Sequence, residues 1–420
     1  VELLDAWHKA PSMVKLLITW EGVLSQQNEF KRGWAVLLGA FIGSGVGLAS
    51  MVYYSTGIWI RPWQEEFGWT RAEIGFQQSI SVMIMMLLAP LVGRLIDRFG
   101  LRRVAALCLL GYGLFLAIFP FMSGALLVLY ALSFGYAIFG VGTTGIAFTR
   151  AVNAFFIKNR GLALGICLTS TGVMAFAMPR YMTPYVAEHG WRAGFWVMFA
   201  IVMVSVPLVY LLLRDAPKDE DGQPQHEQSG LTLGQAIRTV TFWKVASIFL
   251  LISTAILGLI PAFIPLLQDA GLSAKQAGQL GAALGLSVMV ARLLIGFVID
   301  RIFAPYVAAV AFSFVALGCL ALGLGGIEYA IVAAIALGFA VGAEVDLIGY
   351  FTARYFGLAH YGAIYGLQYS IFIFGAAIGP VYTGYIWDLT GNYDLALVIA
   401  AALMVPVVAI ALTLPRFANN

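Results

Sequence analysis

The sequence predicts an all-α membrane protein with about twelve transmembrane helices in two pseudo-symmetric six-helix bundles. Of its 420 residues, 61% are hydrophobic and 11% are charged, whereas soluble domains carry about 25% charged residues. Apolar runs of roughly 20 residues recur along the chain, and each is long enough to cross a bilayer as a helix. A membrane barrel is excluded, because barrel strands are only about 10 residues long and alternate in polarity.

Each half of the chain carries six apolar runs. In the first half they cover 34–58, 74–93, 104–122, 125–149, 161–186 and 193–213. In the second half they cover 243–267, 277–299, 305–327, 329–353, 362–386 and 394–414. The resulting bundles are residues 31–213 and 242–420. Residues 214–241, rich in Pro, Gly, Asp, Glu and Gln, are typical of a flexible linker.

Residues 1–30 mix charged residues with tryptophans. They lack the basic start and apolar run of a secretory signal. An interfacial helix is one interpretation of this N-terminal segment, and a start-site artefact is the other.

Lysine and arginine set the predicted orientation, because they concentrate in cytoplasmic loops. Four lie in one set of loops: Arg61, Arg71, Arg192 and Lys275. Fifteen lie in the other: Lys31, Arg32, Arg94, Arg98, Arg102, Arg103, Lys158, Arg160, Arg214, Lys218, Arg238, Lys244, Arg301, Arg354 and Arg416. Both termini and the linker are therefore predicted to be cytoplasmic, in a multi-pass protein of the cell inner membrane.

The two halves repeat one another. A shift of 203 residues pairs Gly68 with Gly271, Thr70 with Ser273, Gly75 with Gly278, Gly93 with Gly296, Asp97 with Asp300 and Arg98 with Arg301. A shift of 201 pairs Gly161 with Gly362, Gly165 with Gly366, Pro179 with Pro380 and Gly190 with Gly391. Glycine is common here, but ten matches at nearly one offset indicate two related bundles that rock about a central site.

The loop GRLIDRFGLRR at 93–103 joins the second and third spans on the predicted inner face, and a shorter copy, GFVIDR, recurs at 296–301. Gly93 is expected to allow close helix contact, and Gly100 to form the tight turn. The pattern resembles the signature loop of the major facilitator superfamily. This resemblance covers the whole chain and implies that superfamily's fold, without indicating a substrate.

Three segments resemble the monocarboxylate transporter branch. GWAVLLGAFI at 33–42 is similar to the start of that family's first span, and FFIKNRGLALG at 155–165 to the start of its fifth. MVAR at 289–292 is similar to its eighth span, where the family carries a functional arginine. The resemblance implies that Arg292 binds the substrate carboxylate.

The sequence also departs from that branch and from the related oxalate–formate exchangers. Many monocarboxylate transporters have an Asp four residues before the arginine, where this chain has Val288, and a Lys in the first span, where it reads MVYYST. The exchangers use a Lys in span 11, and 362–386 contains none. The resemblance therefore does not imply proton coupling, which would depend on the acidic residues of this chain.

Arg292 is unusual on physical grounds alone. It lies about 12 Å along its helix from Asp300 at the inner end. A charge at that depth costs at least about 2.5–3.5 kcal/mol unless it is paired or hydrated. An arginine facing a cavity suits a carboxylate, which it can bind through two parallel hydrogen bonds. The alternative is a structural ion pair between helices.

Glu344 and Asp346 lie at a similar depth in span 10, about 15 Å and 12 Å from Arg354. Residues two apart point about 200° apart on a helix, so only one of them is expected to face a cavity. A buried carboxyl favours its protonated form, and a nearby arginine opposes this, which is the combination that proton coupling requires. The alternative is that either acid only neutralises Arg292 or Arg150.

Two further groups complete the candidate residues. An inner gate is predicted from Asp97, Arg98, Arg150, Asp300, Arg301 and Arg354; for the arginines, the alternative is an interaction with lipid headgroups. A cavity lining is predicted from Tyr53, Tyr54, Gln78, Asn153, Tyr350, Gln368 and Tyr369. Tyr350 follows Asp346 by one turn, so these two share a face.

These features predict a secondary active transporter that moves a small organic anion, a monocarboxylate, with protons by alternating access. An anion exchanger and a proton-coupled efflux pump for amphiphilic compounds are the alternatives. A membrane enzyme or sensor is disfavoured, because the sequence has no nucleophile triad, metal spacing or phosphate loop. The expected partners are the anion, protons and the bilayer, with no cofactor and no nucleic acid, and the expected working unit is a monomer.

Overall fold

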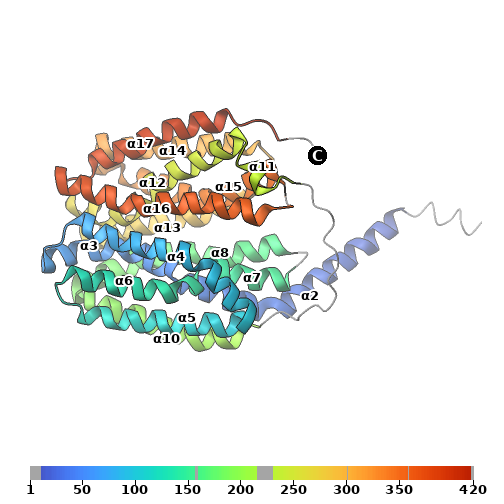
Figure 1. Cartoon of the computed structure of the whole chain (residues 1–420), viewed down its shortest axis with the longest axis horizontal. Helices are drawn as coiled ribbons and strands as arrows, with labels where there is room; N and C mark the ends of the chain where they lie inside the picture. Colours follow the sequence, from blue (N-terminus) through green and yellow to red (C-terminus); the bar gives the residue numbers. More distant parts are fainter. Residues whose placement is uncertain (1–10, 157–158, 215–229, 300, 358, 418–420) are drawn as a thin grey trace, which may run out of the picture.

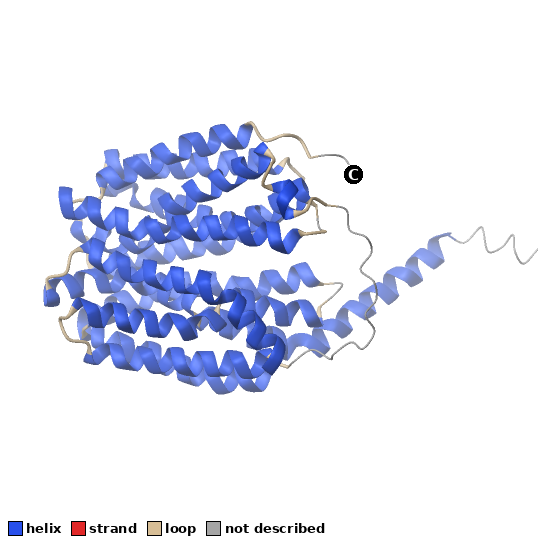
Figure 2. Ribbon diagram, in the orientation of Figure 1, coloured by secondary structure: helices blue, strands red, loops and turns tan. Residues whose placement is uncertain are grey.

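The computed structural model describes residues 11–156, 159–214, 230–299, 301–357 and 359–417. Helices account for nearly all of these residues (Figure 1, Figure 2). Within the described ranges, 11 helices are long and apolar enough to cross a membrane, and a bent pair raises the number to 12. The all-α membrane fold predicted from the sequence is confirmed, and the observed spans differ from the predicted ones mainly by extending a few residues further at their ends.

The helices form two bundles, one blue to green and one yellow to red in Figure 1. The first contains α2 (Pro11–Val46), η1 (Leu48–Val52), α3 (Tyr53–Phe67), α4 (Arg71–Phe99), α5 (Leu101–Ile118), η2 (Phe119–Phe121), α6 (Leu126–Gly140), η3 (Val141–Thr143), α7 (Gly145–Phe155), α8 (Arg160–Ala177), η4 (Met178–Met182), α9 (Thr183–His189) and α10 (Trp191–Leu212). The second contains α11 (Leu233–Ala236), α12 (Val240–Asp269), α13 (Ala274–Ile299), α14 (Ala304–Gly325), η5 (Ile327–Tyr329), α15 (Ala330–Phe356), α16 (Tyr361–Thr390) and α17 (Asp394–Leu412).

The first span is broken rather than continuous. Its two parts, Glu29–Val46 and Leu48–Phe67, meet at an angle of 42°. At the break, the backbone N–H of Leu48 donates a hydrogen bond of 3.1 Å to Thr143 Oγ1. A side chain at Gly47 would overlap the carbonyl oxygen of Thr143, so the break needs glycine. The N-terminal part of α2 extends beyond the bundle (Figure 1), and residues 1–10 of the predicted interfacial segment lie outside the described residues.

The glycines that repeat between the halves form equivalent turns. Gly68 and Gly271 have φ angles of 72° and 91°, and Gly190 and Gly391 have φ angles of 82° and 75°. These left-handed conformations favour glycine because other residues carry a Cβ that clashes there. The offset of about 200 residues therefore places glycines of positive φ at corresponding helix ends in the two halves.

The helices that follow the first of these turns begin with the same cap. Thr70 Oγ1 accepts from the N–H of Glu73 at 3.2 Å, and Glu73 Oε2 accepts from the N–H of Thr70 at 2.8 Å. In the second half, Ser273 and Gln276 make the same reciprocal pair at 3.3 and 3.0 Å. This capping box satisfies two backbone donors at the start of α4 and of α13.

The repeat also appears where the two bundles meet. A Cβ at Gly75 would lie 2.5 Å from the carbonyl oxygen of Pro380, and a Cβ at Gly278 would overlap the carbonyl oxygen of Pro179. These contacts pack α4 of the first half against α16 of the second half, and α13 of the second half against η4 of the first. Repeated positions of the two halves therefore make equivalent contacts at the interface. Small residues let the backbones approach this closely.

The signature loop behaves only partly as predicted. Gly100 has a φ of 85° and forms the turn between α4 and α5, as expected. The expectation for Gly93 is wrong in this structure, because nothing lies within 4 Å of the position that its Cβ would occupy.

Cysteine labelling tests the predicted orientation. Ser123 and Gly234 are exposed at opposite ends of the helices, one between η2 and α6 and the other in α11. In intact cells, a membrane-impermeant maleimide is expected to label Ser123→Cys and to spare Gly234→Cys until the membrane is permeabilised. Labelling of Gly234→Cys alone in intact cells would reverse the assignment of inner and outer faces.

Candidate functional site

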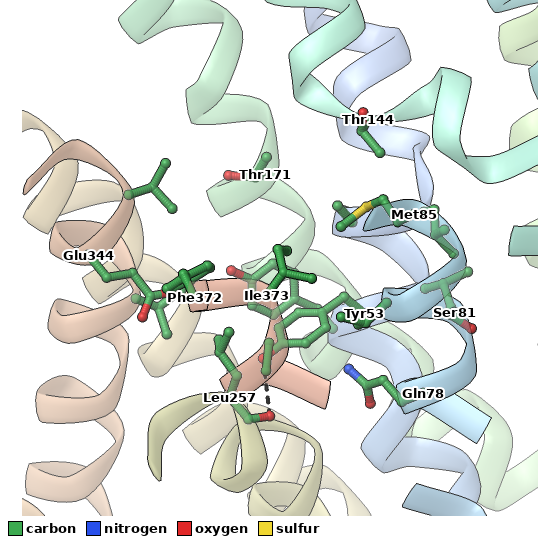
Figure 3. A pocket seen from close by; sticks show the side chains of 18 of the residues that line it. Tyr53, Gln78, Ser81, Met85, Thr144, Thr171, Leu257, Glu344, Phe372 and Ile373 are labelled. Atoms are coloured by element: carbon green, nitrogen blue, oxygen red, sulfur yellow. Dashed lines mark hydrogen bonds between the residues drawn. The ribbon is translucent and has the colours of Figure 1, made fainter. Parts of the chain in front are cut away.

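A cavity of about 300 Å³ lies between the two bundles. In the first half it is lined by residues of η1, α3, α4, α6, α7 and α8, and in the second half by residues of α12, α13, α15 and α16. Figure 3 shows Glu344 on one side of this space and Gln78 and Ser81 on the opposite side. Of the sequence-predicted residues, six line it: Tyr53, Tyr54, Gln78, Arg292, Glu344 and Tyr369.

Close packing of α13 against α15 brings Arg292 and Glu344 to the same wall. A Cβ at Gly342 would lie 2.6 Å from the carbonyl oxygen of Val288 and 3.3 Å from the backbone nitrogen of Arg292. Gly338, one turn earlier, packs in the same way against the backbone of Leu284. The small residues at these two positions therefore set how near the arginine and the acid can come.

Arg292 and Glu344 are close enough to interact electrostatically, and each also interacts with Tyr54 and Tyr369. Glu344 is 2% exposed, and its Oε2 has no hydrogen-bond partner among the described residues. Arg292 Nε is likewise buried without a partner in the described part of the chain. Unsatisfied polar atoms beside a cavity are atoms that a bound molecule or water can satisfy.

The facing wall, contributed by the first half, carries polar but uncharged groups among apolar side chains. Gln78 Oε1 is buried without a partner among the described side chains. Nearby, the Tyr136 hydroxyl accepts from Gln77 Nε2 at 2.5 Å and lies 2.9 Å from Ser81 Oγ. The Tyr53 hydroxyl donates across the cavity to the carbonyl oxygen of Leu257 at 3.4 Å, the dashed line in Figure 3. The opposite charges of the site thus lie on one half, and neutral hydrogen-bonding groups lie on the other.

Three predicted lining residues lie elsewhere. Gln368 is buried away from the cavity, where its Nε2 donates to the carbonyl oxygen of Phe242 at 3.0 Å. The Tyr350 hydroxyl donates to the carbonyl oxygen of Ile299 at 3.1 Å, which caps the last turn of α13. Asn153, on α7, is also absent from the lining. Gln368 and Tyr350 face neighbouring helices, a direction that depth along the span does not determine.

The described arginines that were predicted to form the inner gate lie near the predicted inner ends of their helices. The Arg301 guanidinium stacks 3.5 Å from the ring of Phe297, and Arg354 lies 4.9 Å from the ring of Phe417. Arg98 and Arg150 are exposed. The side chain of Asp97 and all of Asp300 lie outside the described residues, as does the side chain of Asp346. The pairing of these arginines with the two aspartates therefore stays a prediction.

The predicted outer side is joined by a cluster that we call the outer latch: Arg71, Asp269, Trp387, Asp388 and Tyr393. The Arg71 side chain is 2% exposed and pairs with Asp269 at 2.7 Å. Its guanidinium donates to the Tyr393 hydroxyl at 2.7 Å and lies 3.7 Å from the Trp387 ring. Burial is the main cause that raises the pKa of Tyr393, so this phenol stays neutral near pH 7.

The latch also holds the first turn of α4. The backbone N–H groups of Arg71 and Ala72 donate to the two carboxylate oxygens of Asp388, each at 2.9 Å. A carboxylate is favourable there because the start of a helix carries unpaired N–H groups and a partial positive charge. A residue of the second half thus caps a helix of the first half.

The space around the site differs between the two sides. Next to the latch, only a void of about 10 Å³ lies among Thr56, Ile60 and Arg71. The main cavity instead includes Thr149, in the middle of α7, and Tyr365, one turn from the predicted inner end of α16. The structure is therefore closed on the predicted outer side, with its cavity extending toward the inner side.

Sequence reasoning missed the latch and the hydroxyl groups of the facing wall. The latch partners of Arg71 lie almost 200 residues or more from it in the sequence, which indicates Arg71 only as an outer-loop charge. The wall residues, among them Ser81, Thr144 and Thr171, are only weakly indicated by the sequence. They are polar residues within apolar spans, and such residues tend to face a cavity or another helix rather than lipid.

Comparisons with known proteins agree with this architecture. A family model described as Major Facilitator Superfamily matches residues 37–343. Monocarboxylate transporter 13 of Rattus norvegicus is 26% identical over 405 residues, which cover 92% of this chain and 89% of that protein. Monocarboxylate transporter 11 of Homo sapiens is 25% identical over 409 residues, covering 91% and 83%.

Solved structures share the fold. A bacterial homolog of the human lysosomal transporter Spinster, inward-facing and occupied, superposes with a TM-score of 0.72 at 16% identity, covering 92% of this chain and 97% of that one. Its inward-facing, unoccupied form gives a TM-score of 0.69 at 19% identity, covering 90% and 94%. At these identities the likeness concerns the fold alone.

Proposed function

Because this chain belongs to the major facilitator superfamily and resembles its monocarboxylate branch, we propose that it moves a monocarboxylate together with a proton across the cell membrane. The observation that carries the proposal is that the half-buried Arg292 and the buried Glu344 line the same wall of the cavity between the bundles. Arg292 binds the carboxylate of the substrate, and Glu344 carries the proton. The relatives named monocarboxylate transporters support this substrate class.

Charge balance explains how the two cargoes are coupled. With the site empty, the guanidinium of Arg292 balances an ionised Glu344. When Glu344 takes up a proton, Arg292 is left without a counter-ion and accepts the substrate carboxylate through its planar fork of donors. The empty and the fully loaded sites therefore have the same net charge from these groups.

Partial loading is disfavoured by the same argument. An anion bound without a proton leaves one uncompensated negative charge, and a proton bound without an anion leaves one uncompensated positive charge. Moving an unpaired charge from water into the protein interior costs several kcal/mol, roughly the effective penalty found in real proteins. Rocking of the bundles about the site, with the cavity exposed to one side at a time, is then favoured only for the empty and doubly loaded forms.

Counterflow into proteoliposomes tests this function. Vesicles loaded with an unlabelled carboxylate are expected to take up the labelled one transiently, and an alkaline interior is expected to drive net accumulation. Counterflow without any response to the pH gradient would indicate an anion exchanger instead. Transport of amphiphilic cations is disfavoured, because Arg292 repels a cation at the site.

The outer latch gives a second test, of alternating access. Ile60 is 5% exposed beside the small void beneath Arg71. In Asp269→Asn, Arg71 loses its ion-pair partner, so the closed outer side is destabilised and the outward-open form gains population. The labelling of Ile60→Cys by an impermeant maleimide is expected to rise about tenfold, which corresponds to about 1.4 kcal/mol.

A matched control is available on α3. Glu66 pairs with Arg192 at 2.5 Å, and both residues belong to the first bundle, so Glu66→Gln removes an ion pair without separating the bundles. This variant is expected to leave the labelling of Ile60→Cys unchanged. If Asp269→Asn also leaves it unchanged, the latch does not hold the outer side closed.

A further inference from the structure

Four aromatic side chains form a stacked row along α16: Tyr361, Tyr365, Tyr369 and Phe372. Their spacing of three or four residues places them on one face of the helix. Successive ring centroids are 5.4, 5.7 and 5.6 Å apart, and the interplanar angles are 18°, 12° and 23°. The rings are therefore nearly parallel over the whole row.

The row runs from the predicted inner end of α16 into the cavity. Tyr361 is the first residue of the helix, and the other three members line the cavity. Tyr369 lies close enough to Arg292 and Glu344 to interact electrostatically with both. The aromatic row thus reaches the charged pair that binds the carboxylate, and Phe372 lies one turn beyond it.

The rest of the space next to the row is largely apolar. Val52, Val82, Met85 and Leu257 contribute to it, and Figure 3 shows Met85 and Leu257 around Tyr53 and Phe372. A methionine thioether packs favourably against aromatic rings. The volume of about 300 Å³ is at the lower end of the range for drug-sized ligands, roughly 300–1,000 Å³. A two- or three-carbon acid bound at Arg292 would leave most of this apolar space without contacts.

We propose that the preferred substrate is a monocarboxylate with a planar aromatic body, which stacks on Tyr369 and Phe372 while its carboxylate binds Arg292. This inference rests on the proposed function and specifies its substrate. An aromatic pair adds a stabilisation equivalent to about 2- to 13-fold in affinity beyond apolar burial. Tyr365 and Tyr361 extend the same surface toward the inner side and give the ring a path along which it can leave.

Competition in proteoliposomes tests the preference with ligands matched in charge. Phenylacetate and cyclohexylacetate each carry six ring carbons and one carboxylate, but only the first has a flat π-system. Butanoate serves as the short acid. Half-saturation constants are taken from initial rates after subtraction of protein-free vesicles, because weak acids also cross lipid unaided. The expected order of affinity is phenylacetate, then cyclohexylacetate, then butanoate, with roughly 3- to 10-fold between the first two.

Two leucine variants on the same helix separate stacking from general packing. Phe372 is 4% exposed and faces the cavity, whereas Phe374 is 59% exposed on the outer surface of the bundle. Phe372→Leu is expected to lower the preference for phenylacetate over cyclohexylacetate by about 2-fold or more, the lower limit for the loss of one aromatic pair. Phe374→Leu is expected to leave that preference as it is in the wild type.

The affinities of the wild-type protein for the three acids test the aromatic preference even if Phe372→Leu does not fold. Uptake of butanoate with equal or weaker binding of phenylacetate would overturn the aromatic preference and leave the proposed function standing. Equal affinity for phenylacetate and cyclohexylacetate would overturn stacking in the same way. Lack of uptake of all three acids by folded protein would overturn the proposed function as well.

Discussion

Arg292→Ala is expected to abolish carboxylate uptake, and Arg292→Lys to weaken substrate binding by about 1–3 kcal/mol. Alanine removes the only positive charge among the described residues that line the cavity. Lysine keeps the charge but replaces the flat fork of donors with a single ammonium, so bidentate recognition of the carboxylate is lost. Initial uptake rates and half-saturation constants in proteoliposomes measure both effects.

The structural alternative for Arg292 makes a different prediction. If the arginine served only to neutralise Glu344, Arg292→Ala would lower the melting temperature by leaving a buried acid without its counter-ion. Arg238, which is exposed next to α11, provides the matched control: Arg238→Ala is expected to change neither uptake nor stability. A folded Arg292→Ala protein that transports carboxylate with unchanged affinity would remove Arg292 from the binding site. Arg292→Lys gives the answer if the alanine variant does not fold.

Glu344→Gln is expected to abolish accumulation driven by a pH gradient while counterflow continues. Glutamine is uncharged, so a site loaded with anion alone balances Arg292 and can cross. The empty site then carries an unpaired arginine, and its return is slow because the charge has no counter-ion. The variant becomes an exchanger, which is seen by comparing net uptake with counterflow in the same preparation.

Two further variants complete this test. Glu328→Gln, at an exposed acid of η5, is expected to keep pH-driven accumulation. Asp346→Asn examines the second acid that the sequence singles out in span 10. Persistence of pH-driven accumulation in both single variants and in the double variant would show that neither acid carries the proton.

Much of the architecture could be predicted from the sequence, because it depends on local patterns. Apolar runs identify the spans, and the repeated Gly68–Thr70 and Gly271–Ser273 positions turn out to be helix ends and caps. The break at Gly47 could not be predicted, since it depends on the hydrogen bond that Thr143 provides from a distant segment.

The candidate site, too, could be predicted only in part from the sequence. Depth along a span identified Arg292 and Glu344, because a charge far from both helix ends needs a partner or a cavity. Rotation about the helix axis is not given by depth, so Gln368 and Tyr350 were expected in the cavity and instead satisfy the carbonyl groups of neighbouring helices. The outer latch depends on side chains from both halves, and no spacing within either half indicates that they meet.

The most direct test of proton-coupled monocarboxylate transport is initial uptake of labelled carboxylate into proteoliposomes under two separately imposed gradients. One is a pH gradient at zero membrane potential, and the other is a membrane potential at equal pH. Protein-free vesicles give the background. The charge balance at Arg292 and Glu344 predicts uptake that rises with an alkaline interior and does not respond to the potential. Uptake driven by the potential, or indifferent to the pH gradient, would contradict it.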